Sequence, residues 1–294
     1  MKKINLSYVL TTFNKIEFLK ITLALAIHSC AADEEIVVVD GGSSDGTCDY
    51  LQSLLNQGKI HQFISEKDFG EAHGTNKGML MARGELIKII TDDDVFFYPA
   101  IQKCKKFMLE NPTLDVLGFD GFGANRSGQD PEFKQGNFII GFMAWKKSKK
   151  PFLFSGLSLM IRKSSLAYLG LLNPLFKIVD MEYSMRISSL QARIAFFTGL
   201  GFVNIVGPES NSVKFSRSIE EERVRVRRMY LPEEPGVTIS QKVKNIRGSL
   251  GEVKRRIVGK QTVAPALSYS EMVNRSQAIL EESNLNHPGE ILTS

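Results

Sequence analysis

Near the start of the chain, an isoleucine and three valines lie between two acidic residues, Glu35 and Asp40. The run is too short for an ordinary helix and shows no alternation of polar and apolar side chains. A β-branched run that is apolar on both faces is typical of a strand in a parallel sheet covered by helices on both sides. Turn-forming residues follow at 41–46, and helical spacing resumes over 47–55. This segment therefore predicts a parallel sheet between two layers of helices.

The same order of strand and helix continues on both sides of this run. The expected segments are strands at 4–12, 60–64 and 85–91 and helices at 15–29, 76–81 and 99–110. The first helix carries a capping-box pattern, Asn14 with Glu17 three positions later. This series predicts an α/β fold with a Rossmann-like, mainly parallel sheet flanked by helices. In such sheets, ligands bind at the carboxyl ends of the strands.

The second half of the chain is less regular. Glycines indicate loops across residues 111–140: Gly118, Gly121, Gly123, Gly128 and Gly136. Helical spacing returns over 164–170 and 181–191. After Gly207-Pro208 the sequence becomes highly charged, which predicts a boundary near residue 210 and a basic helical C-terminal extension. The polar residues 265–294 are expected to be peripheral.

Composition excludes several classes of protein. The 294 residues are 43% hydrophobic and 23% charged, which is typical of a folded globular chain. No apolar run approaches the ~20 residues of a membrane helix, and the N-terminus lacks the pattern of a cleaved signal peptide. The three widely spaced cysteines indicate neither a disulfide framework nor a metal site. A reducing, cytoplasmic location is expected.

Positive charge is concentrated in residues 214–260, where thirteen Lys and Arg stand against six Glu. This gives a local net charge of +7, whereas the whole chain carries +5. Such asymmetry indicates an anionic partner surface, such as a membrane or a polyanion, or else a solvated helical face. Peripheral attachment to the inner face of a membrane is therefore one expectation for this region.

Three adjacent carboxylates, Asp92, Asp93 and Asp94, follow the apolar segment 86–90. They repel one another, and a hard divalent cation such as Mg²⁺ or Mn²⁺, which prefers carboxylate oxygens, would neutralise them. Such a cation also bridges to a diphosphate, the leaving group of a nucleotide-sugar. An acidic turn before the helix at 99–110, favoured by the helix dipole, explains the triplet equally well.

Five motifs, in this order and spacing, resemble family 2 glycosyltransferases of the GT-A fold. They read VLTTFNK (9–15), EEIVVVDGGSSDGT (34–47), DFGEAHGTNKGMLMARGE (68–85), TDDDVF (91–96) and VDMEYSMR (179–186). The resemblance covers about residues 5–205. It implies a metal-dependent, inverting transfer of a sugar from a nucleotide-sugar donor to an acceptor hydroxyl. It also implies a role in surface polysaccharide or glycan synthesis, with a glycan or lipid-linked acceptor.

The resemblance divides the chain by role. A GT-A catalytic domain at 1–210 is expected to hold the nucleotide-sugar in its first half, 1–97, and the acceptor in its second half, 98–210. Residues 211–294 form the basic helical extension and tail.

Carried over residue by residue, the resemblance implies six residues that bind the nucleotide-sugar: Thr11, Phe13, Asp40, Asp68, Lys77 and Asp92. Phe13 is expected to stack on the base, with a core aromatic as the alternative. Gly41 stands where many members have a second, base-reading Asp, so the base is left open. Lys77 would face phosphate, with a solvent-facing helix lysine as the alternative.

The resemblance assigns the metal to Asp93, with Asp94 as a supporting residue or second ligand, and the general base to Asp180. A base must take the acceptor proton as the hydroxyl oxygen attacks, and a partly desolvated carboxylate at a helix start suits this role. Val179 stands where the family usually has an acidic residue. Glu182 and Arg186 are better explained as a helical i,i+4 ion pair.

Two other functions compete with this one. A sugar nucleotidyltransferase uses a related sheet, but it opens with a Gly-rich basic phosphate loop that the turn Thr-Thr-Phe-Asn-Lys at 11–15 does not resemble. A nucleic-acid-binding or membrane-binding scaffold would use residues 214–260, although these lack interleaved aromatics for base stacking. Trp145 is expected in the core, and the four histidines show no zinc spacing.

Overall fold

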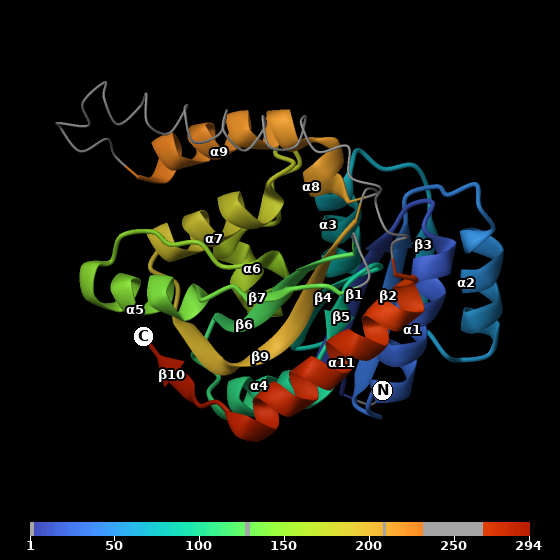
Figure 1. Cartoon of the computed structure of the whole chain (residues 1–294), viewed down its shortest axis with the longest axis horizontal. Coiled ribbons are helices and arrows are strands. Elements are labelled where there is room, and N and C mark those ends of the chain that lie inside the picture. Colours follow the sequence, from blue (N-terminus) through green and yellow to red (C-terminus); the bar gives the residue numbers. More distant parts are fainter. Residues whose placement is uncertain (1–2, 127–129, 208–209, 232–266) are drawn as a thin grey trace.

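The computed structural model describes residues 3–126, 130–207, 210–231 and 267–294 (Figure 1). Its first third alternates strands and helices as the sequence predicts. The elements are β1 (Leu6–Thr12), α1 (Ile16–Ser29), β2 (Glu34–Asp40), α2 (Thr47–Asn56), β3 (Gln62–Ser65), α3 (Glu71–Met81), β4 (Leu86–Thr91), β5 (Val95–Phe96) and α4 (Tyr98–Glu110). Only α3 differs appreciably, beginning five residues before the expected 76. Gly74, a poor helix former, obscures its first turn in the sequence.

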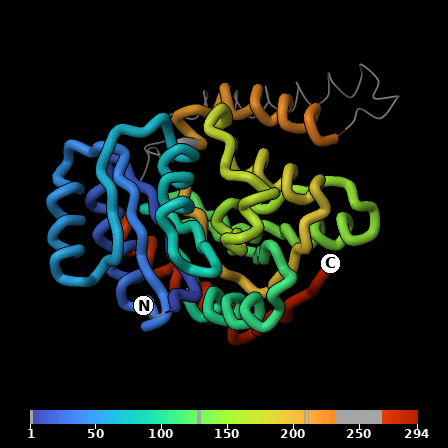
Figure 2. Tube along the Cα trace, turned by 180° about the vertical axis from the view of Figure 1, so that it is seen from behind, coloured from blue at the N-terminus to red at the C-terminus, as the bar shows by residue number. Residues whose placement is uncertain are grey.

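The middle of the chain adds a second set of elements. They are β6 (Val116–Asn125), β7 (Phe133–Gln135), α5 (Phe138–Ser148), the 3₁₀ turn η1 (Gly156–Ser158), β8 (Met160–Arg162), the 3₁₀ turn η2 (Lys163–Ser165), α6 (Leu166–Leu169), α7 (Val179–Ser189) and β9 (Ile194–Val206). The first elements form one side of the molecule and most of this second set forms the other side (Figure 2).

One mixed sheet joins the two sides. Strands β4, β1, β2 and β3 are neighbours in that order and run parallel. Strand β8 lies antiparallel between β4 and β6, and β6 pairs in parallel with β9. The α/β fold with helices flanking the sheet is confirmed. The sheet is more mixed than expected, because β5, β7 and β8 each pair antiparallel with their neighbours.

Two apolar cores cover the two faces of the sheet. Helices α1, α2 and α4 bury their apolar sides against Tyr8, Leu10 and Val38 on one face. Helices α3, α5, α6 and α7 cover Val9 and Val37 on the other. Because consecutive side chains of β1 and β2 enter opposite cores, the central residues of the two strands, 8–10 and 36–39, are apolar without alternation.

Gly136 lies in a loop after β7, as expected, and Gly128 lies outside the described residues. The expected loops are wrong at Gly118, Gly121 and Gly123, because all three lie within β6. Packing explains Gly121 of β6. A Cβ on Gly121 would lie 2.6 Å from the Phe202 ring of β9, and one on Gly201 of β9 would lie 2.3 Å from the Phe119 ring. Each glycine therefore makes room for a phenylalanine of the neighbouring strand, which keeps the two backbones close.

The capping box predicted from Asn14 and Glu17 is also wrong. The N-cap of α1 is Lys15, and no side chain caps it. Asn14 adopts a left-handed conformation, with φ of 51°, and its Oδ1 accepts a hydrogen bond from the Ser44 backbone. It joins two turns instead of capping a helix.

The C-terminal elements return to the sheet. Helix α11 (Tyr269–Asn286) buries Met272 and Leu280 in a third core, and β10 (Ile291–Thr293) pairs antiparallel with β9. The expectation that residues 265–294 are peripheral is therefore wrong. In the view of Figure 1, α11 runs from beside α1 to beside α4.

Helices α8 (Asn211–Lys214) and α9 (Ser216–Tyr230) form the described part of the basic region. The remainder of that region, 232–260, lies outside the described residues. Val226 of α9 packs with Phe176, Ile178 and Met181 beside the start of α7. Among the helices that the structure describes, none is long and apolar enough to cross a bilayer.

Candidate functional site

The turn after β1 is fixed to the turn after β2. The backbone N–H of Asn14 donates to Ser43 Oγ over 2.7 Å, and Ile16 N–H donates to Asp45 Oδ2 over 2.9 Å. Asp45 also accepts from Thr47 at the start of α2, which confirms it as a turn-forming residue. The carboxyl ends of β1 and β2 therefore form one rigid unit.

Thr11, Phe13, Gly41, Asp68 and Gly74, which we call the Phe13 cluster, come together at this edge. A Cβ on Gly41 would lie 2.9 Å from Asp68 Oδ2 and 3.3 Å from the Phe13 ring. A Cβ on Gly74 would meet the same Asp68 oxygen at 2.9 Å. Both glycines thus make room for the Asp68 carboxylate.

Phe13 is not a core residue, since 58% of it is exposed. Its ring lies beside a carboxylate whose Oδ1 is oriented by the Gly70 N–H over 2.9 Å. An exposed aromatic face next to a fixed acceptor is suited to a flat ring that carries N–H donors.

Asp40 lies apart from this exposed surface. It is fully buried, and its two oxygens accept hydrogen bonds from Ser43 and from Ser65 Oγ. The structure therefore shows Asp40 holding the β2 and β3 ends together.

Lys77 points to β3, where its Nζ lies 3.2 Å from Glu66 Oε1. Its neighbour Asn76 exchanges hydrogen bonds with the backbone of Leu172, which ties α3 to the segment that precedes α7. Asn76 thus connects the first set of elements to the second on one face of the sheet. Lys77 is mostly buried and paired with an acidic residue.

The acidic triplet divides into two parts. Asp92 and Asp93 both face Lys15, whose Nζ lies 3.3 Å from Asp92 Oδ1 and 2.5 Å from Asp93 Oδ2. Burial lowers the pKa of Lys15, but the two carboxylates outweigh that effect and raise it overall. We call these three residues the Lys15 site.

Asp94 faces the other way. Its oxygens accept hydrogen bonds from Thr91 Oγ1 at 2.6 Å, from the Ile205 N–H at 2.7 Å and from Asn204 Nδ2 at 3.1 Å. Burial raises its pKa to about 8, and Asp93 adds to the shift. Asp94 therefore anchors β4 to β9 and is committed to protein donors.

The Lys15 site matches the donor chemistry of a divalent cation. Two carboxylate oxygens lie within reach of one positive centre, here an ammonium, and carboxylate oxygens are what Mg²⁺ and Mn²⁺ prefer. In the described parts of the chain, no group of three or more His, Cys, Asp or Glu is placed to hold a metal. A metal here would have to take its remaining ligands from water or a substrate.

Asp180 lies in the first turn of α7, directly beside η1. A Cβ on Gly156 would lie 3.1 Å from the Asp180 Cβ, so glycine permits the close approach. Burial raises the pKa of Asp180, and the N–H groups of Met181 and Gly156, which donate to its carboxylate, oppose the shift. A desolvated carboxylate is suited to accept a proton.

Helix α9 holds the start of α7 in place. Glu222 Oε2 accepts from the Lys177 N–H at 2.6 Å and from the Ile178 N–H at 3.0 Å, which neutralises the positive end of α7. Tyr230 OH donates to Glu182, and Glu182 pairs with Arg186 as expected. A residue from the basic region thus orients the helix of Asp180.

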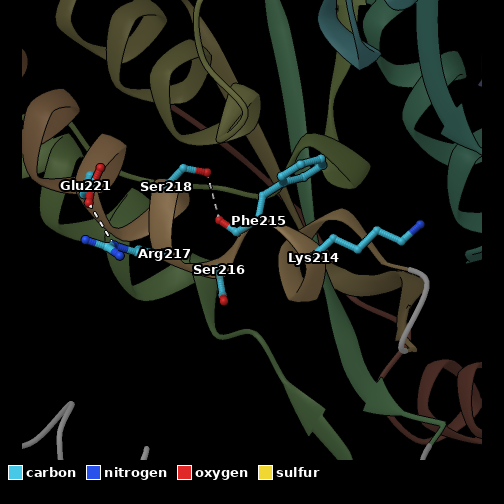
Figure 3. Close-up of a pocket in the computed structure, with 6 residues that line it drawn as sticks. All are labelled: Lys214, Phe215, Ser216, Arg217, Ser218 and Glu221. Atoms are coloured by element: carbon cyan, nitrogen blue, oxygen red, sulfur yellow. Dashed lines mark hydrogen bonds and ion pairs between the residues drawn. The ribbon is translucent and has the colours of Figure 1, made fainter.

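An open hollow of about 450 Å³ lies at the start of α9 (Figure 3). Its lining residues are Lys214, Phe215, Ser216, Arg217, Ser218 and Glu221. Arg217 turns back to pair with Glu221, whereas Lys214 extends away from the other five. The hollow offers no enclosed binding site and forms part of a basic surface.

Three residues that hold parts of the site in place were not predicted from the sequence: Lys15, which pairs with Asp92 and Asp93, Lys88, which bonds to the Leu157 carbonyl, and Glu222. Lys88 could have been noticed as a lone lysine in the apolar strand β4, and Lys15 as the cation that ends the VLTTFNK motif. Glu222 carries no local signal, because its role arises only when α9 packs on α7. Trp145 is buried in the core as expected.

The sequence is similar to those of known glycosyltransferases. The chain is 23% identical over 171 residues to the cholesterol galactosyltransferase of Borreliella burgdorferi, covering 49% of this chain and 48% of that protein. It is 26% identical over 117 residues to a putative teichuronic acid biosynthesis glycosyltransferase, TuaG, of Bacillus subtilis, covering 40% and 46%. The chain spans about half the length of these two relatives.

Solved structures share the fold at low identity. The S. aureus TarS 1–349 complex with UDP-GlcNAc has a TM-score of 0.60 at 19% identity, covering 77% of this chain and 65% of that chain. The mannosyltransferase PcManGT from Pyrobaculum calidifontis, in complex with GDP-Man and Mn²⁺, has a TM-score of 0.52 at 17% identity, covering 96% and 71%. The GT-A fold implied by the sequence motifs is confirmed. Since the family's profile matches residues 7–169, more than half of the sequence, this chain belongs to glycosyl transferase family 2.

Proposed function

We propose that this chain is an inverting glycosyltransferase that moves a sugar from a nucleotide-sugar to an acceptor hydroxyl. The observation that carries the proposal is the turn at 13–15. From it, Phe13 joins the cluster around Asp68, and Lys15 reaches the carboxylates of Asp92 and Asp93. One rigid turn thus serves an aromatic surface and a charged site, as a nucleoside joined to a diphosphate requires. The family match favours this function over a sugar nucleotidyltransferase.

The Phe13 cluster is the proposed site for the nucleoside. The exposed Phe13 ring would stack on the base, Thr11 would line the same edge, and Asp68 would accept hydrogen bonds from base or ribose. Asp68 compensates for the glycine at position 41, because its carboxylate occupies the space above that residue. Asp40 supports the site from below, and Lys77 lies one helical turn from Gly74.

A divalent cation, Mg²⁺ or Mn²⁺, is proposed at Asp93 with Asp92 beside it. When bound, it would offset the negative charge that develops on the departing diphosphate. Asp94 would support the pair by holding β4 against β9. The relative whose structure contains Mn²⁺ and GDP-Man supports this assignment by its fold.

Asp180 is proposed as the general base. Its carboxylate would take the proton of the acceptor hydroxyl while that oxygen bonds to the anomeric carbon, and the bond from that carbon to the diphosphate oxygen breaks. A single displacement of this kind inverts the anomeric configuration and releases a nucleoside diphosphate. The donor would occupy residues 1–97 and the acceptor 98–210, with 211–294 as an extension.

The acceptor is proposed to be a glycan or a lipid-linked sugar in surface polysaccharide synthesis. The names of the relatives, one for teichuronic acid and one for cholesterol, support an acceptor at or near a membrane. The basic surface of α9 supports attachment to the inner, cytoplasmic face of an anionic membrane.

A donor panel tests the function. UDP- and GDP-sugars are incubated with the full chain and Mn²⁺, and nucleoside diphosphate release is measured with and without glycan acceptors. NMR of the product's anomeric proton then gives the stereochemistry. Absence of both binding and turnover with every donor would contradict the proposal, and a retained configuration would contradict the inverting mechanism.

A further inference from the structure

The backbone around Lys15 is held on both sides. Asn14 bonds to Ser43 and Ser44, and Ile16 bonds to Asp45. Lys15 therefore leaves a fixed point at the end of β1, and its side chain crosses to the end of β4. Only 20% of that side chain is exposed, which limits the directions in which it can turn.

The ammonium takes the position that a metal would need. It lies 2.5 Å from Asp93 Oδ2 and 3.3 Å from Asp92 Oδ1, whose side chains are 15% and 7% exposed. With both carboxylates ionised, the Lys15 site carries one net negative charge. A divalent cation added to it would leave a net positive charge in a poorly hydrated place, next to a like-charged ammonium.

A nucleoside diphosphate removes this conflict. Its phosphate charges can neutralise both the ammonium and a divalent cation, so the three components are compatible where the two cations alone are not. Metal binding and donor binding would then strengthen each other by the same factor.

We propose that Lys15 is an internal counter-ion that excludes a divalent cation from Asp92 and Asp93 until the donor diphosphate arrives. The inference rests on the proposed function for its ligand, a nucleoside diphosphate. It adds that this enzyme binds metal and donor as a coupled pair, and that one residue sets the coupling. Lys15 thereby limits the binding of a divalent cation when no nucleotide is bound.

The experiment measures Mn²⁺ binding by electron paramagnetic resonance on the full chain, first without nucleotide and then with UDP or GDP. Lys15→Met removes the ammonium, and Lys15→Arg retains a positive charge. Lys20→Met is the matched control, because Lys20 lies on α1 and pairs with the exposed Glu17 across 3.0 Å. Thermal melting shows whether each variant is folded, and Lys15→Gln serves if Lys15→Met does not fold.

Without nucleotide, Lys15→Met should bind Mn²⁺ at least about tenfold more tightly than wild type, since a nearby positive charge is removed. Lys15→Arg and Lys20→Met should match wild type. The gain in Mn²⁺ affinity on adding nucleotide should be large in wild type and smaller in Lys15→Met. Adding Asp93→Asn to Lys15→Met should abolish the tight binding.

Unchanged or weaker Mn²⁺ binding in Lys15→Met would overturn the inference, as would tight binding that survives Asp93→Asn. The nucleotide-free titration requires no sugar transfer, so it can succeed even if the donor panel fails. Conversely, turnover with an unchanged titration in Lys15→Met would support the proposed function and reject the counter-ion.

Discussion

Lys88 Nζ donates a hydrogen bond to the carbonyl of Leu157 over 2.6 Å, inside the core and out of contact with solvent. The same ammonium donates to the Ile89 carbonyl and lies over the rings of Phe96 and Phe119. Strand β4, which leads to the acidic triplet, is thereby tied to η1, whose Gly156 contacts Asp180. One buried charge fixes the distance between the proposed donor and acceptor sides.

Lys88→Met should therefore lower kcat strongly while changing the melting temperature little. Removing a buried charge relieves its desolvation cost, which offsets the unpaired Leu157 carbonyl, so the melting temperature should change little. The η1 turn loses its tether, and a displaced base should reduce kcat by ~10–100-fold with an unchanged KM for the donor. Lys105→Met is the control, because buried Lys105 pairs with Asp33 and Glu34 away from the site and should cost stability alone.

The pH dependence of stability gives a second readout for Lys88. Burial lowers its pKa from 10.5 to about 7. Between these values the unfolded chain binds a proton that the folded chain does not, so this residue makes the free energy of unfolding rise with pH. Chemical denaturation at several pH values should show that rise in wild type and a weaker one in Lys88→Met. Equal slopes would contradict a buried titrating amine.

The sequence predicts the structure of residues 1–97 better than that of residues 98–210. The valines at 37–39 make both faces of their strand apolar, and this local pattern is enough to predict a strand in a parallel sheet. By contrast, Gly121 lies in a strand beside Phe202, which is far along the chain and fills the space that a side chain at 121 would take. The same holds for the site. Asp93 and Asp180 were found in local motifs, whereas Glu222 acquires its role through a helix that is distant in sequence.

Asp93→Asn should weaken Mn²⁺-dependent donor binding and turnover by about 100-fold or more. Removing a residue that only supports a metal ligand already costs up to about 100-fold, so removing a ligand itself should cost at least as much. The physical reason is that a hard cation loses a charged ligand. Donor binding is measured by calorimetry with Mn²⁺ or with excess EDTA. Asp49→Asn, on the exposed side of α2, is the matched control. Full activity in EDTA would reject the metal.

Asp180→Asn should reduce turnover by roughly 10²–10⁴-fold, the scale of a lost general base, with donor affinity nearly intact. Because burial raises the Asp180 pKa, the acid limb of kcat should lie above the ordinary carboxylate range, and turnover should fall as pH decreases through it. The raised pKa of Asp180 affects folding stability in the opposite direction with pH. A raised folded pKa stabilises the protein at low pH, and this contribution disappears as pH rises. Parallel loss of donor binding and turnover would indicate a structural role.

Asp68→Ala should weaken donor binding by ~10–100-fold, which corresponds to the loss of a hydrogen bond to a charged acceptor. Gly41→Ala should have a similar effect, since its Cβ would lie 2.9 Å from Asp68 Oδ2 and displace the carboxylate. Affinities for UDP and GDP are compared in each variant. A change in the UDP-to-GDP ratio would assign base reading to Asp68, whereas normal affinity for both would exclude it from the donor site.

Helix α9 should bind anionic membranes through its outer face. Glu222 and Val226 face α7, whereas Val224 and Met229 are 45% and 53% exposed near two exposed arginines, Arg227 and Arg228. Each basic residue near an anionic surface contributes ~1 kcal/mol, so these arginines should give weak, salt-sensitive binding.

The assay is co-sedimentation with vesicles of increasing anionic lipid content, at low and high salt. Arg227→Glu with Arg228→Glu reverses two charges on the last turn of α9 and should abolish most of the binding. Lys20→Glu with Lys59→Glu makes the same change in net charge on the donor side and should leave binding nearly intact. Because α9 also orients α7 through Glu222, vesicles that bind α9 should change kcat as well as bring the protein into the pellet. Binding that ignores lipid charge and salt, or equal loss in both double variants, would show that α9 is a solvated face.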